Sequence, residues 1–170
     1  MDLQAYIRNV PDFPKPGIQF KDITPLLADP TAFGSACSQL AKRFAGTPLD
    51  AIAAAEARGF LFAAPMALEL HKSLIPLRKP GKLPYRTISH KYDLEYGSAE
   101  LHMHVDSVTP GAKVLLVDDV LATGGTMAAA CHLIEQAGGV VVGCAFLIEL
   151  GFLNGRRLLT KYDCFSLLTY

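Results

Sequence analysis

An uninterrupted aliphatic run, Val114-Leu115-Leu116-Val117, constrains the fold of this chain more than any other segment. Successive side chains of a strand point to opposite faces of its sheet, so this run requires a strand that is buried on both faces. Such strands are typical of parallel sheets in α/β proteins, where helices cover both faces. Residues 113–117 therefore predict a central strand of a parallel sheet, which the two aspartates Asp118 and Asp119 bring to an end.

Short apolar runs and helical patterns alternate along the rest of the chain. We expect strands at 50–55, 73–77, 100–105, 140–148 and 163–170, and helices at 31–43, 60–70 and 127–137. This alternation predicts an α/β fold with a mostly parallel central sheet flanked by helices. Ligands of such sheets bind beyond the carboxyl ends of the strands, so the loops after residues 55, 77 and 117 form the expected site.

Two segments rich in proline and glycine interrupt this pattern. Residues 11–17 contain three prolines, which exclude a helix or a central strand and predict an ordered loop. Residues 78–97 combine prolines, glycines and cations with a polar stretch, and predict a long mobile loop. We expect one domain over residues 1–170, with an N-terminal hood at about residues 1–30 and a flexible lid at about residues 80–97.

The composition excludes several classes of protein. A chain of 170 residues that is 51% hydrophobic can bury the core of one domain. Its 16 basic and 16 acidic residues create no net positive field, which argues against a nucleic-acid partner. No apolar stretch approaches the roughly 20 residues of a membrane span, and residues 1–4 do not begin a secretory signal. We therefore expect a cytoplasmic protein without membrane contacts.

The cysteines and histidines do not follow a metal-binding pattern. Cys37, Cys131, Cys144 and Cys164 are widely separated and form no CxxC pair, so we interpret them as buried thiols rather than as zinc ligands or disulfides. The histidines are also scattered, without the i, i+4 spacing of a helical metal site. We expect no direct metal ligand in this chain.

The segment after Val117 has the composition of a phosphate-binding loop. Gly124 and Gly125 let backbone N–H groups approach a ligand, Thr123 and Thr126 add hydroxyl donors, and a helix N-terminus follows. Two carboxylates would repel a phosphate, so Asp118 and Asp119 need a different partner. Ribose hydroxyls donate hydrogen bonds to carboxylates, and Mg²⁺ is attracted by them. The segment therefore predicts a site for a ribose 5-phosphate, unless the aspartates only end the strand and cap the next turn.

Residues 114–126 as a whole resemble the phosphoribosyl diphosphate (PRPP) signature of the type I phosphoribosyltransferases. The segment differs from a P-loop because no lysine follows the glycines, and it lacks the GxGxxG pattern of dinucleotide-binding folds. Residues 16–25, 56–60, 78–84 and 92–97 are similar to the adenine-specific branch of that family, so the resemblance covers nearly the whole chain. It implies the type I phosphoribosyltransferase fold and purine salvage, in which adenine and PRPP give AMP and pyrophosphate.

The resemblance also implies roles for individual residues. Contacts to PRPP or AMP are expected from Arg58, Arg78, Lys79, Lys82, Tyr96, Asp118, Asp119, Ala122, Thr123, Gly124, Gly125 and Thr126. Negative charge grows on the departing pyrophosphate, and the cations of this set suit that need. Glu95 is the implied acid/base residue beside the purine N7, and the lid that carries it would close over the substrates and exclude water.

Three residues are the implied contacts of the base. Phe20 offers a face on which adenine can stack, the backbone around Lys21 can read the purine edge, and Leu150 closes the other side. The resemblance implies Mg²⁺ carried by PRPP, with Asp118 contacting it through water, and a homodimer. It further implies a strained or cis peptide near Ala57-Arg58.

Other interpretations of the sequence stay open. The chain could be a regulator of the same fold that binds PRPP or a nucleotide without turnover, or a transferase for a 6-oxopurine base. Arg58, Glu95 and the lid favour the enzyme over the regulator, and the hood with Phe20 favours adenine. Taken singly, Arg58 and the 78–82 cations could be surface charges, Glu95 an idle loop residue, and Phe20 and Leu150 simple core. We assign no role to His90 or Lys91, and we interpret Arg156-Arg157 as a solvated helix face.

Overall fold

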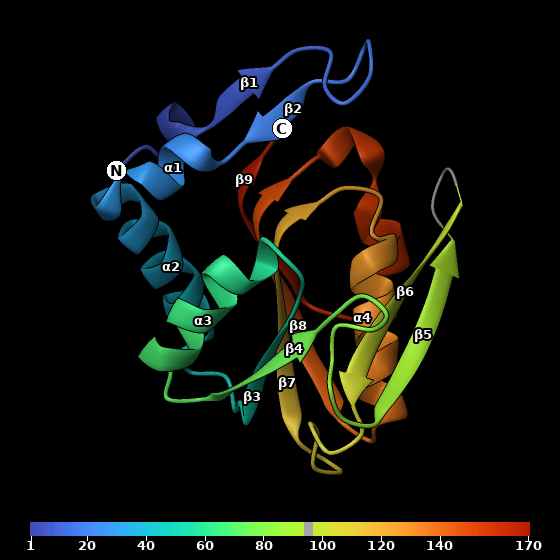
Figure 1. Cartoon of the computed structure of the whole chain (residues 1–170). Coiled ribbons are helices and arrows are strands. Elements are labelled where there is room, and N and C mark those ends of the chain that lie inside the picture. The colour runs from blue at the N-terminus through green and yellow to red at the C-terminus, as the bar shows by residue number, and fades with distance from the viewer. Residues whose placement is uncertain (94–96) are drawn as a thin grey trace.

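A five-stranded sheet with β7 (Lys113–Leu121) at its centre forms the middle layer of the molecule (Figure 1). The computed structural model describes residues 1–93 and 97–170. The other strands of the sheet are β3 (Ala51–Ala55), β4 (Ser73–Leu77), β8 (Val140–Glu149) and β9 (Cys164–Thr169), in the spatial order β4-β3-β7-β8-β9. All neighbouring strands are parallel, and the side chains of Val114 to Val117 are fully buried. The predicted α/β fold with a mostly parallel sheet is confirmed.

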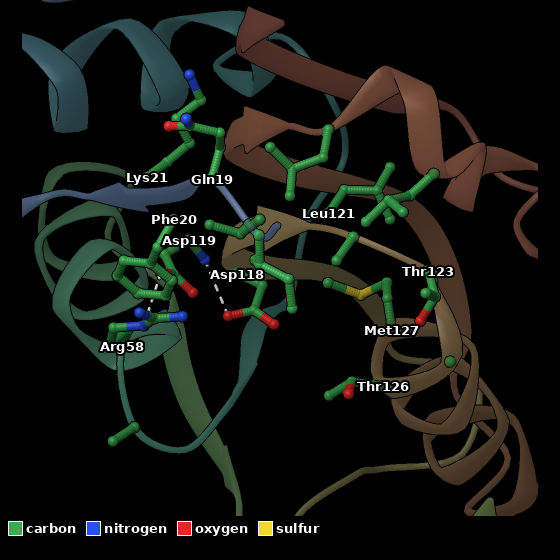
Figure 2. Close-up of a pocket in the computed structure, with 18 of the residues that line it drawn as sticks. Gln19, Phe20, Lys21, Arg58, Asp118, Asp119, Leu121, Thr123, Thr126 and Met127 are labelled. Carbon is green, nitrogen blue, oxygen red and sulfur yellow. Dashed lines mark hydrogen bonds and ion pairs between the residues drawn. The ribbon is translucent and has the colours of Figure 1, made fainter. Parts of the chain in front are cut away.

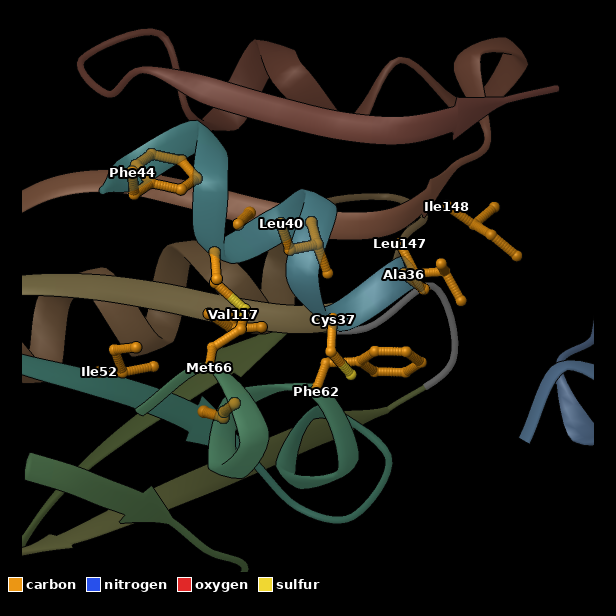
Figure 3. Close-up of a cluster of buried hydrophobic side chains, with 14 of the residues drawn as sticks. Ala36, Cys37, Leu40, Phe44, Ile52, Phe62, Met66, Val117, Leu147 and Ile148 are labelled. Atoms are coloured by element: carbon orange, nitrogen blue, oxygen red, sulfur yellow. The ribbon is translucent and has the colours of Figure 1, made fainter. Parts of the chain in front are cut away.

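Two helices cover one face of this sheet. They are α2 (Pro30–Phe44) and α3 (Gly59–Glu69), close to the predicted ranges. The Asp29 carboxylate caps α2 by accepting hydrogen bonds from the backbone N–H groups of Thr31 and Ala32. Figure 3 shows Leu40 and Phe44 of α2 packing with side chains of α3 and of β3, β7 and β8.

The opposite face is covered by α4 (Gly125–Gln136) and a β-hairpin. The hairpin consists of β5 (Thr87–Asp93) and β6 (Ser98–His104), which pair antiparallel. Leu101 and Met103 of β6 are buried in a second core with α4 and the alternate side chains of β3 and β7. Both faces of the central strands are therefore sealed, which leaves the carboxyl edge of the sheet for ligands.

The N-terminal hood lies over this carboxyl edge (Figure 1). It contains a 3-10 turn at Leu3–Tyr6, the short antiparallel strands β1 (Arg8–Val10) and β2 (Phe20–Asp22), and the helix α1 (Thr24–Ala28). As predicted, the proline-rich residues 11–17 form neither a helix nor a strand. The hairpin of β1 and β2 was not anticipated, because each strand has only three residues.

The predicted loop over residues 78–97 is wrong in part. Residues 87–93 form β5, which pairs with β6 from Thr87↔His104 to Asp93↔Ser98. Polar residues alternate along β5 because one of its faces is solvated, and this polarity concealed the strand. Glu95 and Tyr96 lie outside the described residues, so the expected mobility of the lid stays a prediction.

Two further expectations need correction. The central strand continues beyond the expected end at Val117 as far as Leu121, because Val120 and Leu121 pair with β8. Arg156 is not only a solvated side chain. It lies in a 3-10 turn at Gly155–Leu158, and its guanidinium donates two hydrogen bonds, of 2.7 and 2.6 Å, to the carboxylate of Glu149 at the end of β8. A further 3-10 turn spans Gly151–Leu153.

The cysteines are free thiols, as expected. Three are buried, Cys164 is half-buried, and the sulfur atoms of Cys131 and Cys144 lie 3.7 Å apart. Within residues 1–93 and 97–170, no helix is long and apolar enough to cross a membrane.

A pair of histidine rings joins the β-hairpin to α4. The centre of the His90 ring on β5 lies 4.0 Å from the centre of the His132 ring on α4. Burial lowers the pKa of His90, and the nearby His132 lowers it further. The folded chain therefore resists protonation of His90, whereas the unfolded chain takes up a proton near its ordinary pKa of about 6.5.

We predict that this contact makes the stability of the protein fall in mildly acidic solution. Below about pH 6.5 the unfolded state binds a proton that the folded state does not, so the free energy of unfolding decreases until the pH passes the lowered pKa. His90→Gln should show a smaller decrease between pH 7.5 and pH 5.5 in urea denaturation. An equal decrease in the variant and the parent would contradict the assignment.

Candidate active site

A cleft of about 430 Å³ lies between the hood and the carboxyl ends of β3 and β7. Neighbouring parallel strands end at the same edge of a sheet, so the loops after β3 and β7 meet there. The cleft is lined by residues 18–21 of the hood, 56–58 after β3, 118–127 at the end of β7, and by Leu150 and Leu153 after β8. Figure 2 shows Phe20 and Arg58 at one end of the cleft and Thr123 and Thr126 at the other.

Two adjacent carboxylates form the floor of this cleft. The backbone N–H of Asp119 donates to Asp118 Oδ1 at 2.9 Å, and Asp119 Oδ2 lies 2.8 Å from Nε of Arg58. Burial raises the pKa of Asp118 well above its ordinary value, and the neighbouring charge of Asp119 raises it further. Burial also raises the pKa of Asp119, against the opposing effect of Arg58. A ligand that brings hydroxyl donors or a cation would therefore stabilise the ionised pair.

The glycine-containing loop after β7 turns into α4. Gly124 has a φ of 88°, a left-handed conformation that favours glycine, and α4 begins at the next residue. The backbone of Gly155 packs directly against this turn. A Cβ atom at Gly155 would collide with the carbonyl oxygen of Ala122 and lie 3.1 Å from the backbone nitrogen of Gly124. The absence of a side chain at Gly155 thus allows the loop to take this shape. The sequence predicted only a turn at Asn154-Gly155 and gave no sign of this contact.

Arg58 connects the acidic floor to the hood. Besides its ion pair with Asp119, its guanidinium carbon lies 5.5 Å from the centre of the Phe20 ring. Phe20 is half-buried and also packs edge-on against Phe13, with ring centres 5.1 Å apart. The Phe20 ring is therefore held in place at the cleft, and Leu150 and Leu153 add apolar side chains to the lining of the same cleft. Leu153 was not anticipated, because it belongs to a turn rather than to the end of β8.

The side chain of Lys21 is engaged outside the cleft. Its ammonium group donates to Asn9 Oδ1 at 2.6 Å and lies 3.8 Å from the centre of the Tyr170 ring. Lys21 therefore ties the hood to the C-terminal residue, while its place on the cleft wall is consistent with the expected backbone contact.

A second cavity of about 530 Å³ lies beside the first and shares Glu56 and Thr126 with it. Its walls include Lys79, Lys91 and Glu100. Glu56 was not among the expected site residues, yet it organises this side. Its Oε1 accepts a 2.6 Å hydrogen bond from the backbone N–H of Lys79 and a 3.2 Å hydrogen bond from Nε of Arg78.

The pKa of Glu56 lies below its ordinary value. The main cause is the hydrogen bond from the Lys79 backbone, and the positive charge of Arg78 lowers the pKa further. The peptide between Glu56 and Ala57 is cis, one bond before the expected position near Ala57-Arg58.

The structure brings most of the expected site residues together. The first cleft is lined by Phe20, Lys21, Arg58, Asp118, Asp119, Ala122, Thr123, Gly124, Gly125, Thr126 and Leu150, and the second cavity by Lys79. Arg78 contacts both Glu56 and the carbonyl oxygen of Lys82. Lys82 itself is exposed and lines neither cavity. Glu95 and Tyr96 lie outside the described residues.

Comparison with known proteins identifies relatives along the whole chain. A family model described as the phosphoribosyl transferase domain matches residues 27–168. Adenine phosphoribosyltransferase of Roseiflexus sp. (strain RS-1) is 57% identical over 169 residues, which cover 99% of this chain and 98% of that protein. The protein of the same name from Kosmotoga olearia is 54% identical over 170 residues, which cover 100% of each chain.

Solved structures are also similar to this chain over nearly its whole length. The adenine phosphoribosyltransferase of Thermoanaerobacter pseudethanolicus is 51% identical and superposes with a TM-score of 0.97, covering 99% of this chain and 98% of that one. The Saccharomyces cerevisiae enzyme is 36% identical, with a TM-score of 0.90 and coverage of 97% and 96%. That structure was solved in complex with an imino-altritol 1,6-bisphosphate and adenine.

Proposed function

This chain belongs to the phosphoribosyltransferase family, and we propose that it transfers the phosphoribosyl group of PRPP to adenine in purine salvage, giving AMP and pyrophosphate. One observation carries the proposal: the acid pair Asp118-Asp119, the loop ending at Thr126 and the Phe20 ring all line one cleft. A nucleoside monophosphate has a ribose, a phosphate and a base to match these three parts.

Each part of the cleft has a chemical role. Asp118 and Asp119 accept hydrogen bonds from the two ribose hydroxyls, and the loop around Gly124 binds the 5′-phosphate through backbone N–H groups, hydroxyls and the N-terminus of α4. Phe20 stacks on adenine. The base is then aligned with the ribose C1, which lowers the entropic cost of forming the new bond.

Cations stabilise the departing pyrophosphate. Breaking the bond from C1 to oxygen leaves positive character on the ribose and negative charge on pyrophosphate. Arg58 at the first cleft, with Arg78 and Lys79 at the second cavity, supplies positive charge on that side. Lys82 joins them only if the 80–97 segment closes, and the same closure would exclude water from the ribosyl cation.

Glu95 is the proposed acid/base residue at the purine N7, and Tyr96 a proposed contact of PRPP. Both roles come from the resemblance of residues 92–97 to the family. Glu95 follows β5 by two residues, and β5 lies beside the second cavity.

Mg²⁺ is the proposed cofactor, carried by PRPP. The carboxylate oxygens of Asp118 are hard ligands of the kind that Mg²⁺ prefers, and the carboxylate of Asp119 lines the same cleft beside it. Bound Mg²⁺ would neutralise charge on the diphosphate. Asp118 would hold it through a water molecule.

We propose that the protein is a cytoplasmic homodimer. One face of α3 exposes large apolar side chains: Leu61 is 40% exposed and Leu68, two turns later, is 77% exposed. Exposed apolar side chains on one helix face are typical of a surface that another copy covers.

The function is tested by offering the purified protein PRPP and Mg²⁺ with adenine, hypoxanthine, guanine or xanthine separately, and measuring nucleotides by chromatography. We expect AMP from adenine and negligible product from the other bases. Hypoxanthine and guanine present an acceptor where adenine presents an amine donor, and an unpaired buried polar group costs binding energy. IMP or GMP would indicate a 6-oxopurine enzyme. Tight PRPP binding without any product would indicate a regulator.

Arg58→Ala should separate catalysis from stability. We expect kcat/KM for PRPP to fall about 10²-fold or more, because a cation at the developing charge is lost. The variant should stay folded, because the Arg58 side chain is 47% exposed and the buried Asp119 can take up a proton when it loses this partner.

Arg43→Ala is the matched control. Arg43 is 41% exposed and its Nη2 lies 2.7 Å from Oδ2 of Asp163, which precedes β9 at the edge of the sheet opposite to the cleft. This variant should keep normal turnover in steady-state assays. Equal losses of activity in both variants, or unfolding of Arg58→Ala with normal turnover in its folded fraction, would show that Arg58 is structural.

A further inference from the structure

Tyr92 links the β-hairpin to the loop that binds phosphate in the proposed function. The Tyr92 hydroxyl oxygen lies 3.2 Å from Oγ1 of Thr126, which belongs to the first turn of α4. His90, two residues earlier on the same face of β5, contacts His132 two turns further along α4. The strand is therefore held along the helix at two points, and one of them is a residue of the proposed phosphate site.

The Tyr92 ring is fixed by packing as well as by its hydroxyl. It is half-buried against the core beneath α4. A Cβ atom built on Gly125 would lie 3.6 Å from Cδ2 of Tyr92 and 3.6 Å from the carbonyl oxygen of Asp93, which is van der Waals contact. The end of β5 thus rests on the N-terminus of α4. Packing of the ring against this core places its hydroxyl within reach of Thr126.

When phosphate is bound, the chemistry of the two hydroxyls determines which of them donates the hydrogen bond and which accepts it. A threonine hydroxyl has one proton to donate and can accept two hydrogen bonds. A phosphate oxygen without a proton only accepts, so the single proton of Thr126 must point towards it. The Tyr92 O–H can then donate to Oγ1 of Thr126, and chains of hydrogen bonds of this kind strengthen each member. Without ligand, either hydroxyl can donate to the other.

We propose that Tyr92 is a positioning residue for the 5′-phosphate of the substrate. Its hydroxyl donates to Thr126 and turns the Thr126 proton into the cleft, so it increases affinity for PRPP and AMP through Thr126. This proposal rests on the proposed function, since it takes the ligand of the loop to be a phosphoribosyl group. It adds to the recognition of that group a residue that lines the second cavity rather than the first cleft.

Tyr92→Phe removes the hydroxyl and keeps the ring. We expect KM for PRPP to rise about three- to tenfold, the range for the loss of one hydrogen bond, while kcat and KM for adenine change less than about twofold. The dissociation constant of AMP, measured by calorimetry, should rise by the same factor. Circular dichroism and thermal unfolding would establish that the variant is folded.

Tyr162→Phe is the matched control. Tyr162 packs in the same core, and its hydroxyl donates a 2.8 Å hydrogen bond to Glu135 at the other end of α4. Loss of that hydrogen bond should lower stability and leave KM for PRPP unchanged. A rise in KM in both variants would show a general effect on α4 and would overturn the proposal.

A double-mutant cycle with Thr126→Ala tests whether Tyr92 acts through Thr126. AMP dissociation constants are used, so that the cycle does not depend on turnover. In the Thr126→Ala background, Tyr92→Phe should have no further effect. The same fold-change in both backgrounds, or no change in the single variant, would contradict the proposal. Failure of the parent protein to make AMP would instead contradict the proposed function, so the two failures are distinguishable.

Discussion

Burial of β7 on both faces is the constraint on which the rest of this structure depends. Helices α2 and α3 seal one face of the sheet, and α4 with the hairpin seals the other, so the strand can present polar groups only at its end. There it delivers Asp118 and Asp119 to the floor of the cleft. The end of β7 also determines where the loop after β3 lies. A Cβ atom at Gly59 would lie 2.9 Å from Oδ1 of Asp118 and 3.1 Å from the carbonyl oxygen of Val117, so glycine lets the segment carrying Arg58 approach the acids.

The site is assembled from segments that are far apart in the sequence. Arg58 bridges the acid floor and the hood, because it pairs with Asp119 and lies against the Phe20 ring. Glu56 organises the side of the second cavity, because it accepts hydrogen bonds from Arg78 and from the backbone N–H of Lys79. Arg58 and Arg78 are thus each paired with a carboxylate, of Asp119 and Glu56 respectively. In the proposed function, ribose hydroxyls and phosphate oxygens would take over as partners of these groups, so that their charges stay compensated when the ligand is bound.

The features that the sequence predicted well lie close together in the chain. The aliphatic run of β7, its two carboxylates and the loop to Thr126 form one continuous segment, and a continuous segment can be interpreted without knowing the fold. The contributions of Glu56, Gly155 and Tyr92 depend on contacts between distant segments, which no local pattern encodes. The strand β5 was missed for a related reason: its solvated face makes the sequence polar, and only its pairing with β6 reveals it.

The central claim is that the buried acid pair recognises the two hydroxyls of a ribose. The most direct test compares the binding of AMP and 2′,3′-dideoxy-AMP by calorimetry, since the two ligands differ only in those hydroxyls. Hydrogen bonds to charged groups contribute about 1.5–3 kcal/mol, so we predict that the dideoxy nucleotide binds at least about tenfold more weakly. Equal affinities would contradict the account, because Asp118 and Asp119 would then have no part in recognising the ribose.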